Sequence, residues 1–157
     1  MFVLLMAAIM LSGCSLFTVQ QDDDPKKIQQ TVTQIRVITK TAMGKYLDKV
    51  AKKNPEKALK LSTDAIEKFD KFIEPILNKD KVSMTAVAID TILSKIQSLD
   101  EKWKDYLKDG WDIFESVATL PSGDEVMNSK GVQYFRAFLQ GVKEACVRFK
   151  EEQEDNG

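Results

Sequence analysis

Apolar residues recur at steps of three and four over most of the chain, the spacing that gathers them on one face of an α-helix. Four such stretches follow one another, separated by short polar or proline-containing segments. We find no strand pattern and no internal repeat. The chain is therefore predicted to be all-α, an up-down bundle of four long helices at about 25–53, 55–75, 82–117 and 122–150.

Local signals mark the ends of these helices. Asp24 and Asn54 are favourable N-caps, and each precedes a proline that suits the first helical position. Pro75 lacks a backbone donor and crowds the preceding turn, so the second helix is predicted to kink or stop there. Ser122 and Glu125 have the spacing of a capping box, which predicts the start of the last helix.

The third stretch keeps its rhythm from Val82 to Val117, which indicates a long helix. Gly110 is the expected weak point, because glycine costs about 1 kcal/mol relative to alanine inside a helix. The element is therefore predicted to be one long helix, or a long helix followed by a short one after a break near Gly110.

An unbroken apolar run from Phe2 to Leu11 precedes the helical part. Ten residues are too few to span a bilayer, which needs about 20, but they fit the apolar region of a signal peptide. The run ends in the four residues Leu11-Ser12-Gly13-Cys14. This ending resembles the lipobox of bacterial lipoproteins with a type II signal peptide: an aliphatic residue, a small residue, glycine or alanine, then cysteine.

The resemblance implies that the signal peptidase recognises Leu11, Ser12 and Gly13, removes residues 1–13 and leaves a lipidated Cys14. A covalent diacylglyceride with an added acyl chain such as palmitate anchors such proteins stably. Ser15 favours the periplasmic face of the outer membrane in a Gram-negative host, and otherwise the outer face of the cell membrane. The predicted order is signal peptide 1–13, lipid-anchored tether 14–24, helical bundle 25–150 and charged tail 151–157.

Charge is unevenly distributed along the mature part. Ten Lys or Arg residues oppose two acids between residues 26 and 60, whereas acids outnumber bases from residue 61 onward. Two interpretations stay open. The basic helix packs beside acidic ones, or it binds anionic lipid headgroups or another anionic envelope polymer. Nucleic acid is not an expected partner of an exported protein. The candidate surface residues are Lys45, Lys49, Lys52 and Lys53.

The chain contains no histidine, which removes the commonest general base and the commonest metal ligand. With Cys14 acylated, Cys146 is a single thiol, too few for a cysteine-only zinc site or a redox pair. We therefore expect no metal and no cofactor beyond the covalent lipid. Cys146 lies near Val142 and Phe149 on an apolar helix side, so it is predicted to be buried, with an intermolecular disulfide as the alternative.

The third predicted helix carries a row of carboxylates and a cluster of aromatic residues, and each has a structural and a functional interpretation. A row of carboxylates is explained by a solvated helix face, and a glycan-cleft acid/base pair or a calcium site would need a concavity or a tight loop. An aromatic cluster is explained by core packing, and Trp111 is the first candidate to stack on a sugar or enter the headgroup region. The carboxylates are Glu101, Asp105, Asp109 and Asp112, and the aromatics are Trp103, Tyr106, Trp111 and Phe114.

These observations favour a membrane-anchored envelope lipoprotein that acts as a non-enzymatic helical binding module. A small-ligand carrier or a carboxylate-based enzyme with a cavity in the bundle is the alternative, and such a cavity would measure several hundred Å3. A third hypothesis is a phage or mobile-element lipoprotein that protects the envelope. The sequence does not indicate the oligomeric state.

Overall fold

The computed structural model describes residues 24–78, 84–123 and 125–155. The predicted signal peptide, the lipobox with Cys14, Ser15 and the tether before Asp24 lie outside the described residues, as do residues 79–83 and the last two residues of the charged tail. The described part is all-α, with one isolated antiparallel bridge between Thr85 and Val126. Its elements are α2 (Pro25–Ala51), α3 (Pro55–Lys68), η2 (Phe69–Ile73), α4 (Glu74–Leu77), α5 (Ala86–Gln97), α6 (Trp103–Val117) and α7 (Ser129–Asp155).

The first two helices begin where their caps predict. The Asp24 side chain accepts a backbone N–H at the start of α2, and the Asn54 side chain does the same for α3, both at 2.9 Å. Pro25 and Pro55 occupy the first helical positions. Each cap satisfies an N–H that has no partner within its helix. The local cap at Asn54 therefore allows α3 to begin after a very short connection to α2.

The second helical segment changes its winding just before Pro75, where the sequence predicts a kink or a stop, and it ends at Leu77. α3 passes into the π-helical stretch η2, where the backbone N–H of Glu74 donates to the carbonyl of Phe69. Pro75 cannot donate to the carbonyl of Lys71 and its ring crowds that carbonyl. The wider π-turn accommodates the proline ring and the missing hydrogen bond, and the helix then continues as α4.

The predicted break in the third helix was placed wrongly. α5 and α6 are separated at residues 98–102, and Gly110 lies inside α6. Asp100 shapes the break: its carboxylate accepts the backbone N–H of Lys102 at 2.8 Å and the hydroxyl of Tyr46. Leu99 is half-buried within the turn, so the apolar rhythm continues through a segment that is not helical.

The last helix also begins later than predicted. Ser122 and Glu125 do hydrogen-bond to each other, but they form an isolated turn and α7 starts at Ser129. Asn128 accepts the backbone N–H of Gly131 at 2.6 Å and so caps the helix. At its other end α7 stays helical through Asp155, where the sequence predicted a frayed tail.

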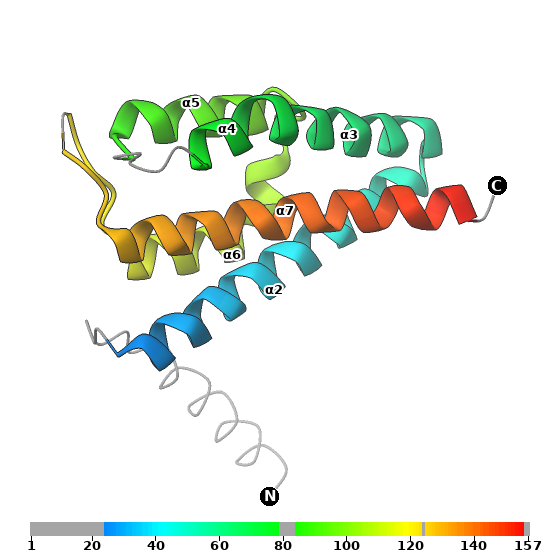
Figure 1. Cartoon of the computed structure of the whole chain (residues 1–157). Coiled ribbons are helices and arrows are strands. Elements are labelled where there is room, and N and C mark those ends of the chain that lie inside the picture. Colours follow the sequence, from blue (N-terminus) through cyan, green and yellow to red (C-terminus); the bar gives the residue numbers. More distant parts are fainter. Residues whose placement is uncertain (1–23, 79–83, 124, 156–157) are drawn as a thin grey trace, which may run out of the picture.

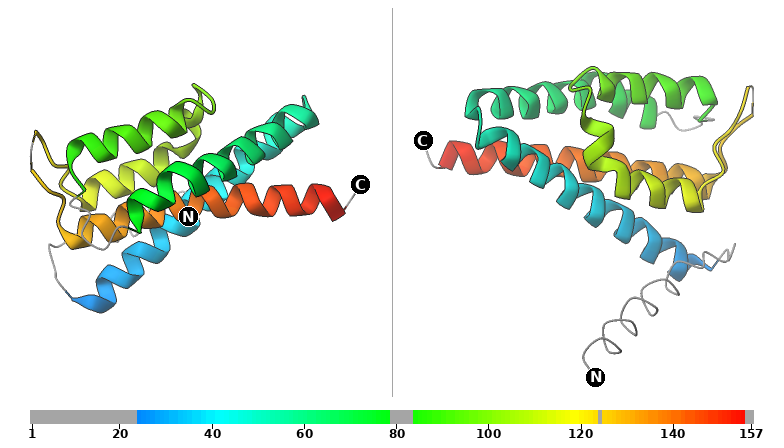
Figure 2. Two further views of the ribbon diagram at one scale, coloured as in Figure 1. Left: turned by 45° about the horizontal axis from the view of Figure 1, so that its top comes forward. Right: turned by 180° about the vertical axis from the view of Figure 1, so that it is seen from behind.

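Successive rods run back and forth, and α7 lies across the middle of the molecule (Figure 1). α3 and α5 lie on one side of α7, whereas α2 crosses it obliquely on the other, as the second pair of views also shows (Figure 2). Because α5 and α6 are separate, the described residues form five helical rods. The four-helix expectation therefore holds only at the level of an all-α bundle.

Three helices meet at Thr39, which is fully buried in α2. Gly141 of α7 lies against the α2 backbone, and a Cβ there would be 2.6 Å from the carbonyl oxygen of Arg36. Gly110 of α6 lies against the Thr39 side chain, where a Cβ would be 2.3 Å from Oγ1. The two glycines let α6 and α7 approach α2 closely, which explains why Gly110 interrupts no helix.

Candidate binding groove

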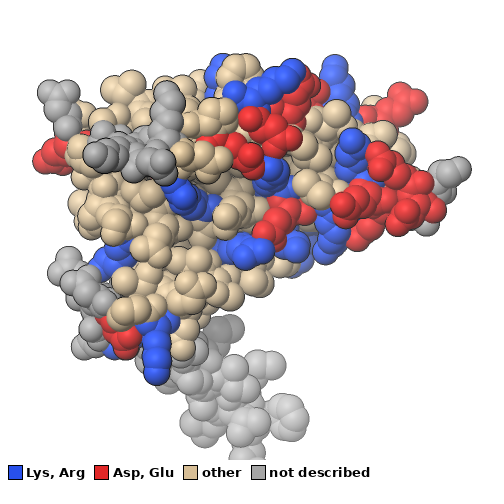
Figure 3. All heavy atoms as spheres, in the orientation of Figure 1, with Lys and Arg blue, Asp and Glu red and all other residues tan. Residues whose placement is uncertain are grey.

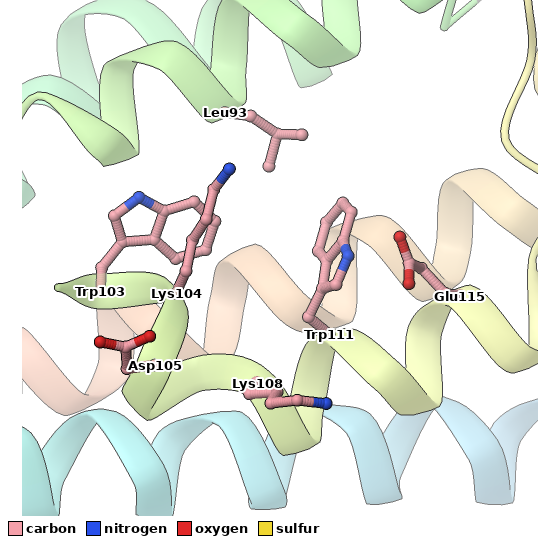
Figure 4. A pocket seen from close by; sticks show the side chains of 7 residues that line it. All are labelled: Leu93, Trp103, Lys104, Asp105, Lys108, Trp111 and Glu115. Carbon is pink, nitrogen blue, oxygen red and sulfur yellow. The ribbon is translucent and has the colours of Figure 1, made fainter. Parts of the chain in front are cut away.

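An open groove of about 430 Å3 lies between α5 and α6 (Figure 4). This volume falls within the range of small-molecule sites, about 300–1,000 Å3. The two tryptophans of the sequence both line the groove. Its lining consists of Leu93, Trp103, Lys104, Asp105, Lys108, Trp111 and Glu115.

Phe138 of α7 supports both indoles from below. Its ring centroid lies 6.5 Å from that of Trp103 and 5.5 Å from that of Trp111, the second pair meeting edge to face. Phe114 adds a contact at 5.0 Å to Trp111. Because Trp103 is buried and Trp111 is half-buried, the two rings form a fixed apolar wall with one exposed edge.

Lys104 stands over the first indole. Its Nζ lies 5.9 Å from the Trp103 ring centroid, and the side chain extends toward Leu93 (Figure 4). The Trp103 Nε1 is buried and has no hydrogen-bond acceptor among the described residues. One end of the groove is therefore filled by a cation that belongs to the protein itself.

The rim of the groove carries both signs of charge. Lys108 pairs with Asp112 one turn along α6, and the hydrogen bond that its ammonium donates to that carboxylate raises the pKa of Lys108. Glu115 lies within ion-pair distance of no base among the described residues, although its charge also contributes to raising the pKa of Lys108. Its carboxylate lies beside Trp111 (Figure 4). Asp105 is directed away from the two indoles. The Trp111 end therefore carries an unpaired negative charge.

A separate surface, which we call the basic face, is formed by the four predicted lysines: Lys45 and Lys49 of α2, and Lys52 and Lys53 just after its end. All four are exposed. Lys49 lies 5.4 Å above the ring of Tyr106, an aromatic of α6 that packs against Tyr46 and not into the groove. The structure therefore does not bring the basic face and Trp111 together.

The rest of α2 follows the simpler interpretation of its charge. Arg36 and Lys40 both pair with Glu144 of α7, at 2.5 and 3.4 Å. Lys143 on the same helix pairs with Asp70 at 2.8 Å and also with Glu74. Acidic side chains gather at the far end of α7 (Figure 3). Part of the basic segment thus packs beside acids, whereas the basic face stays exposed.

Tyr46 and Asp100 join α2 to the turn before α6. Burial raises the pKa of the Tyr46 phenol, and the neighbouring Asp100 carboxylate adds to the effect. Burial opposes ionisation of Asp100, but the hydrogen bonds from Tyr46 and from the backbone of Lys102 outweigh it, so the pKa of Asp100 is lowered. The pair fixes the break between α5 and α6 and hence the geometry of the groove.

Cys146 is fully buried in α7, as predicted. Burial raises the pKa of its thiol to about 12. A thiol enclosed in this way cannot reach another molecule while the fold is intact, which excludes the alternative of an intermolecular disulfide.

Sequence reasoning identified part of the groove and missed the rest. Trp111, the aromatic that the sequence singled out, lines the groove and is half-buried, and its role in binding stays a prediction. Trp103 and Phe114 are buried, as core packing predicts. Leu93 and Phe138 were missed, because each continues an ordinary apolar helix stripe. The predicted carboxylate row is exposed, but Glu101 lies in the turn before α6, so only Asp105, Asp109 and Asp112 share the helix.

No group of His, Cys, Asp or Glu side chains suited to holding a metal ion occurs within residues 24–78, 84–123 and 125–155. Over the same ranges, no helix combines the length and apolarity needed to cross a membrane. Searches against protein-family models, curated proteins and solved structures found no match to this chain.

Proposed function

We propose that this chain is a non-enzymatic binding module, held by lipid on a bacterial envelope membrane, and that the groove between α5 and α6 is its binding site. The observation that carries the binding role is the pair of indoles. Trp103 and Trp111 are held rigidly by Phe138 and border open space of small-molecule size. Rigid aromatic walls with a few charged groups at the rim are typical of ligand sites.

The lipid anchor rests on the lipobox resemblance at Leu11 to Cys14. Its attachment point precedes Asp24, at the start of α2. A helix of 27 residues is about 40 Å long, so the basic face lies about 30–40 Å from the tether. The anchor and the basic face reach one membrane with a short tether when α2 lies along its surface, and a steeper α2 needs the residues from Cys14 to Asp24 to be nearly extended.

A small-ligand carrier is the second candidate. The groove favours it, because about 430 Å3 suits a compact molecule and the rim offers Lys104 and Glu115 as polar contacts. Both candidates use the same groove: a carrier would hold a small molecule there, and a protein-binding module would hold part of another protein.

Site-specific photocrosslinking tests the groove. A benzophenone amino acid replaces Leu93, which lines the groove, in cells that express the full chain. The matched control carries the same amino acid at Val87, which lies on the same helix, is 70% exposed and does not line the groove.

After irradiation, the mass of the intact protein is measured. We expect a defined adduct from position 93 and none from position 87, and the adduct mass separates a protein partner from a small ligand. Equal labelling at both positions, or none at position 93, would contradict the proposed site.

A further inference from the structure

We infer that the groove takes a small organic cation with an apolar body, its charged group seated beside Trp111 and Glu115. The inference rests on the proposed function, since it names the chemical class of the ligand for that groove. It follows from the charges on the rim of the groove, from the position of Lys104 over the Trp103 ring, and from the volume of the groove.

α6 carries more acids than bases over the stretch that borders the groove. The helix carries two lysines against four acids within the stretch that borders the groove, namely Lys104 and Lys108 against Asp105, Asp109, Asp112 and Glu115. Lys108 is neutralised by its pair with Asp112. An anionic ligand would therefore meet the unpaired Glu115 carboxylate at the Trp111 end, whereas a cation would be attracted to it.

Indole rings attract cations through the negative potential of their faces, and tryptophan does so best among the aromatics. Lys104 already uses the Trp103 ring in this way, at 5.9 Å. A second cation at that end would be repelled by the Lys104 ammonium. The Trp111 end has the half-buried indole and the Glu115 carboxylate, and Lys108, which also lines the groove, is already paired with Asp112. The charged group of the ligand therefore belongs at the Trp111 end.

The apolar remainder of the ligand then lies along Leu93 and the edge of Trp103 that borders the groove. Between these walls, about 430 Å3 accommodates a compact body such as one aromatic ring with a short substituent. A substituted ammonium suits this arrangement, because it is weakly hydrated and gives up little on entering an aromatic site.

Tryptophan fluorescence of the purified full chain measures occupancy directly, since both tryptophans line the groove. Three probes share one aromatic body and differ in charge: benzyltrimethylammonium, benzyl alcohol and benzenesulfonate. We expect benzyltrimethylammonium to bind most tightly and benzenesulfonate most weakly.

Two substitutions of exposed residues should move the affinity in opposite directions. Glu115→Gln is expected to weaken benzyltrimethylammonium binding about fivefold, the size of one moderate charge or cation–π contact. Lys104→Gln is expected to strengthen it, because the repelling ammonium is gone. Glu151→Gln, the same change on the exposed end of α7, should leave it unchanged.

Failure of the inference and failure of the proposed function give different results. If benzenesulfonate binds as tightly as the ammonium probe, or if Glu115→Gln and Glu151→Gln behave alike, the cation assignment is wrong while the groove remains a binding site. If no probe binds but position 93 still yields its photoadduct, the cation assignment is again wrong and the proposed function stands. Absence of both signals would overturn both.

Discussion

Gly141→Ala is the most informative single change, because it adds one methyl group where two helices touch. An added Cβ would lie 2.6 Å from the carbonyl oxygen of Arg36, 2.9 Å from Cβ of Thr39 and 3.0 Å from the amide nitrogen of Lys40. Two of these atoms belong to the backbone of α2 and cannot rotate away. The helices must therefore separate, and the core that they enclose loosens.

The expected magnitude follows from two opposing effects. Overpacking of a well-filled core costs typically about 1–3 kcal/mol, and replacing glycine by alanine inside a helix returns about 1 kcal/mol. Since the clash involves backbone, we place the overpacking cost at the upper end and expect a net loss of about 2 kcal/mol. Gly44→Ala in α2 is the matched control, because its nearest contact would be the end of Arg148 at 4.0 Å.

Urea unfolding followed by circular dichroism measures both variants against the parent chain. Gly44→Ala should be stabilised by up to about 1 kcal/mol, and Gly141→Ala destabilised, which separates the two by about 3 kcal/mol. A Gly141→Ala chain as stable as Gly44→Ala would refute the close crossing of α2 and α7.

A rescue experiment separates the two contacts at the crossing. Gly110→Ala would clash chiefly with the Thr39 hydroxyl, at 2.3 Å. Adding Thr39→Ala should therefore restore much of the stability of Gly110→Ala. It should restore little for Gly141→Ala, whose closest contact is the carbonyl of Arg36.

Three further predictions concern the Cys146 thiol, the hydrogen bond between Tyr46 and Asp100, and the basic face. The Cys146 thiol, with its pKa raised to about 12 by burial, should not react with a chromogenic disulfide reagent at pH 8 until urea is added, and rapid reaction of the folded chain would contradict its burial. Tyr46→Phe should cost about 1.5–3 kcal/mol in urea unfolding at pH 7. Because the pKa of Asp100 is lowered in the folded state, its contribution is present above the unfolded pKa of about 3.9 and should shrink as the pH falls below it; a cost that does not change with pH would argue against the charged hydrogen bond. Adsorption of the unlipidated chain to phosphatidylserine vesicles should weaken as salt rises and be lost when the basic face is changed to glutamine, whereas salt-independent adsorption would count against that surface.

The helices themselves were largely predictable from the sequence, because their starts depend on neighbours within a few residues. Asp24 and Asn54 cap α2 and α3 through local hydrogen bonds, and Pro75 changes the winding through a local clash. The break between α5 and α6 was not predictable in this way. It depends on Asp100 accepting the hydroxyl of Tyr46, 54 residues earlier, while the apolar rhythm continues unchanged.

Gly110 shows the same limit from the opposite side. The low helix propensity of glycine predicted a break. Instead, the Thr39 side chain packs where a Cβ of residue 110 would lie, and α6 is continuous through Gly110. The groove was only partly predictable for a similar reason. Trp111 was singled out because a break at Gly110 would turn it outward, and it lines the groove although α6 is unbroken there. The participation of Leu93 and Phe138 depends on how α5 and α7 pack against α6.

The most direct test of the account is the intact mass of the protein made in a bacterium, wild type beside Cys14→Ser, with the membrane and soluble fractions separated. We predict that the wild-type chain sediments with the membrane, lacks residues 1–13 and carries the mass of a diacylglyceride with an acyl chain. The Cys14→Ser chain should show no lipid mass. An unprocessed wild-type chain in the soluble fraction would contradict the lipid anchor and move the search for a partner away from the envelope.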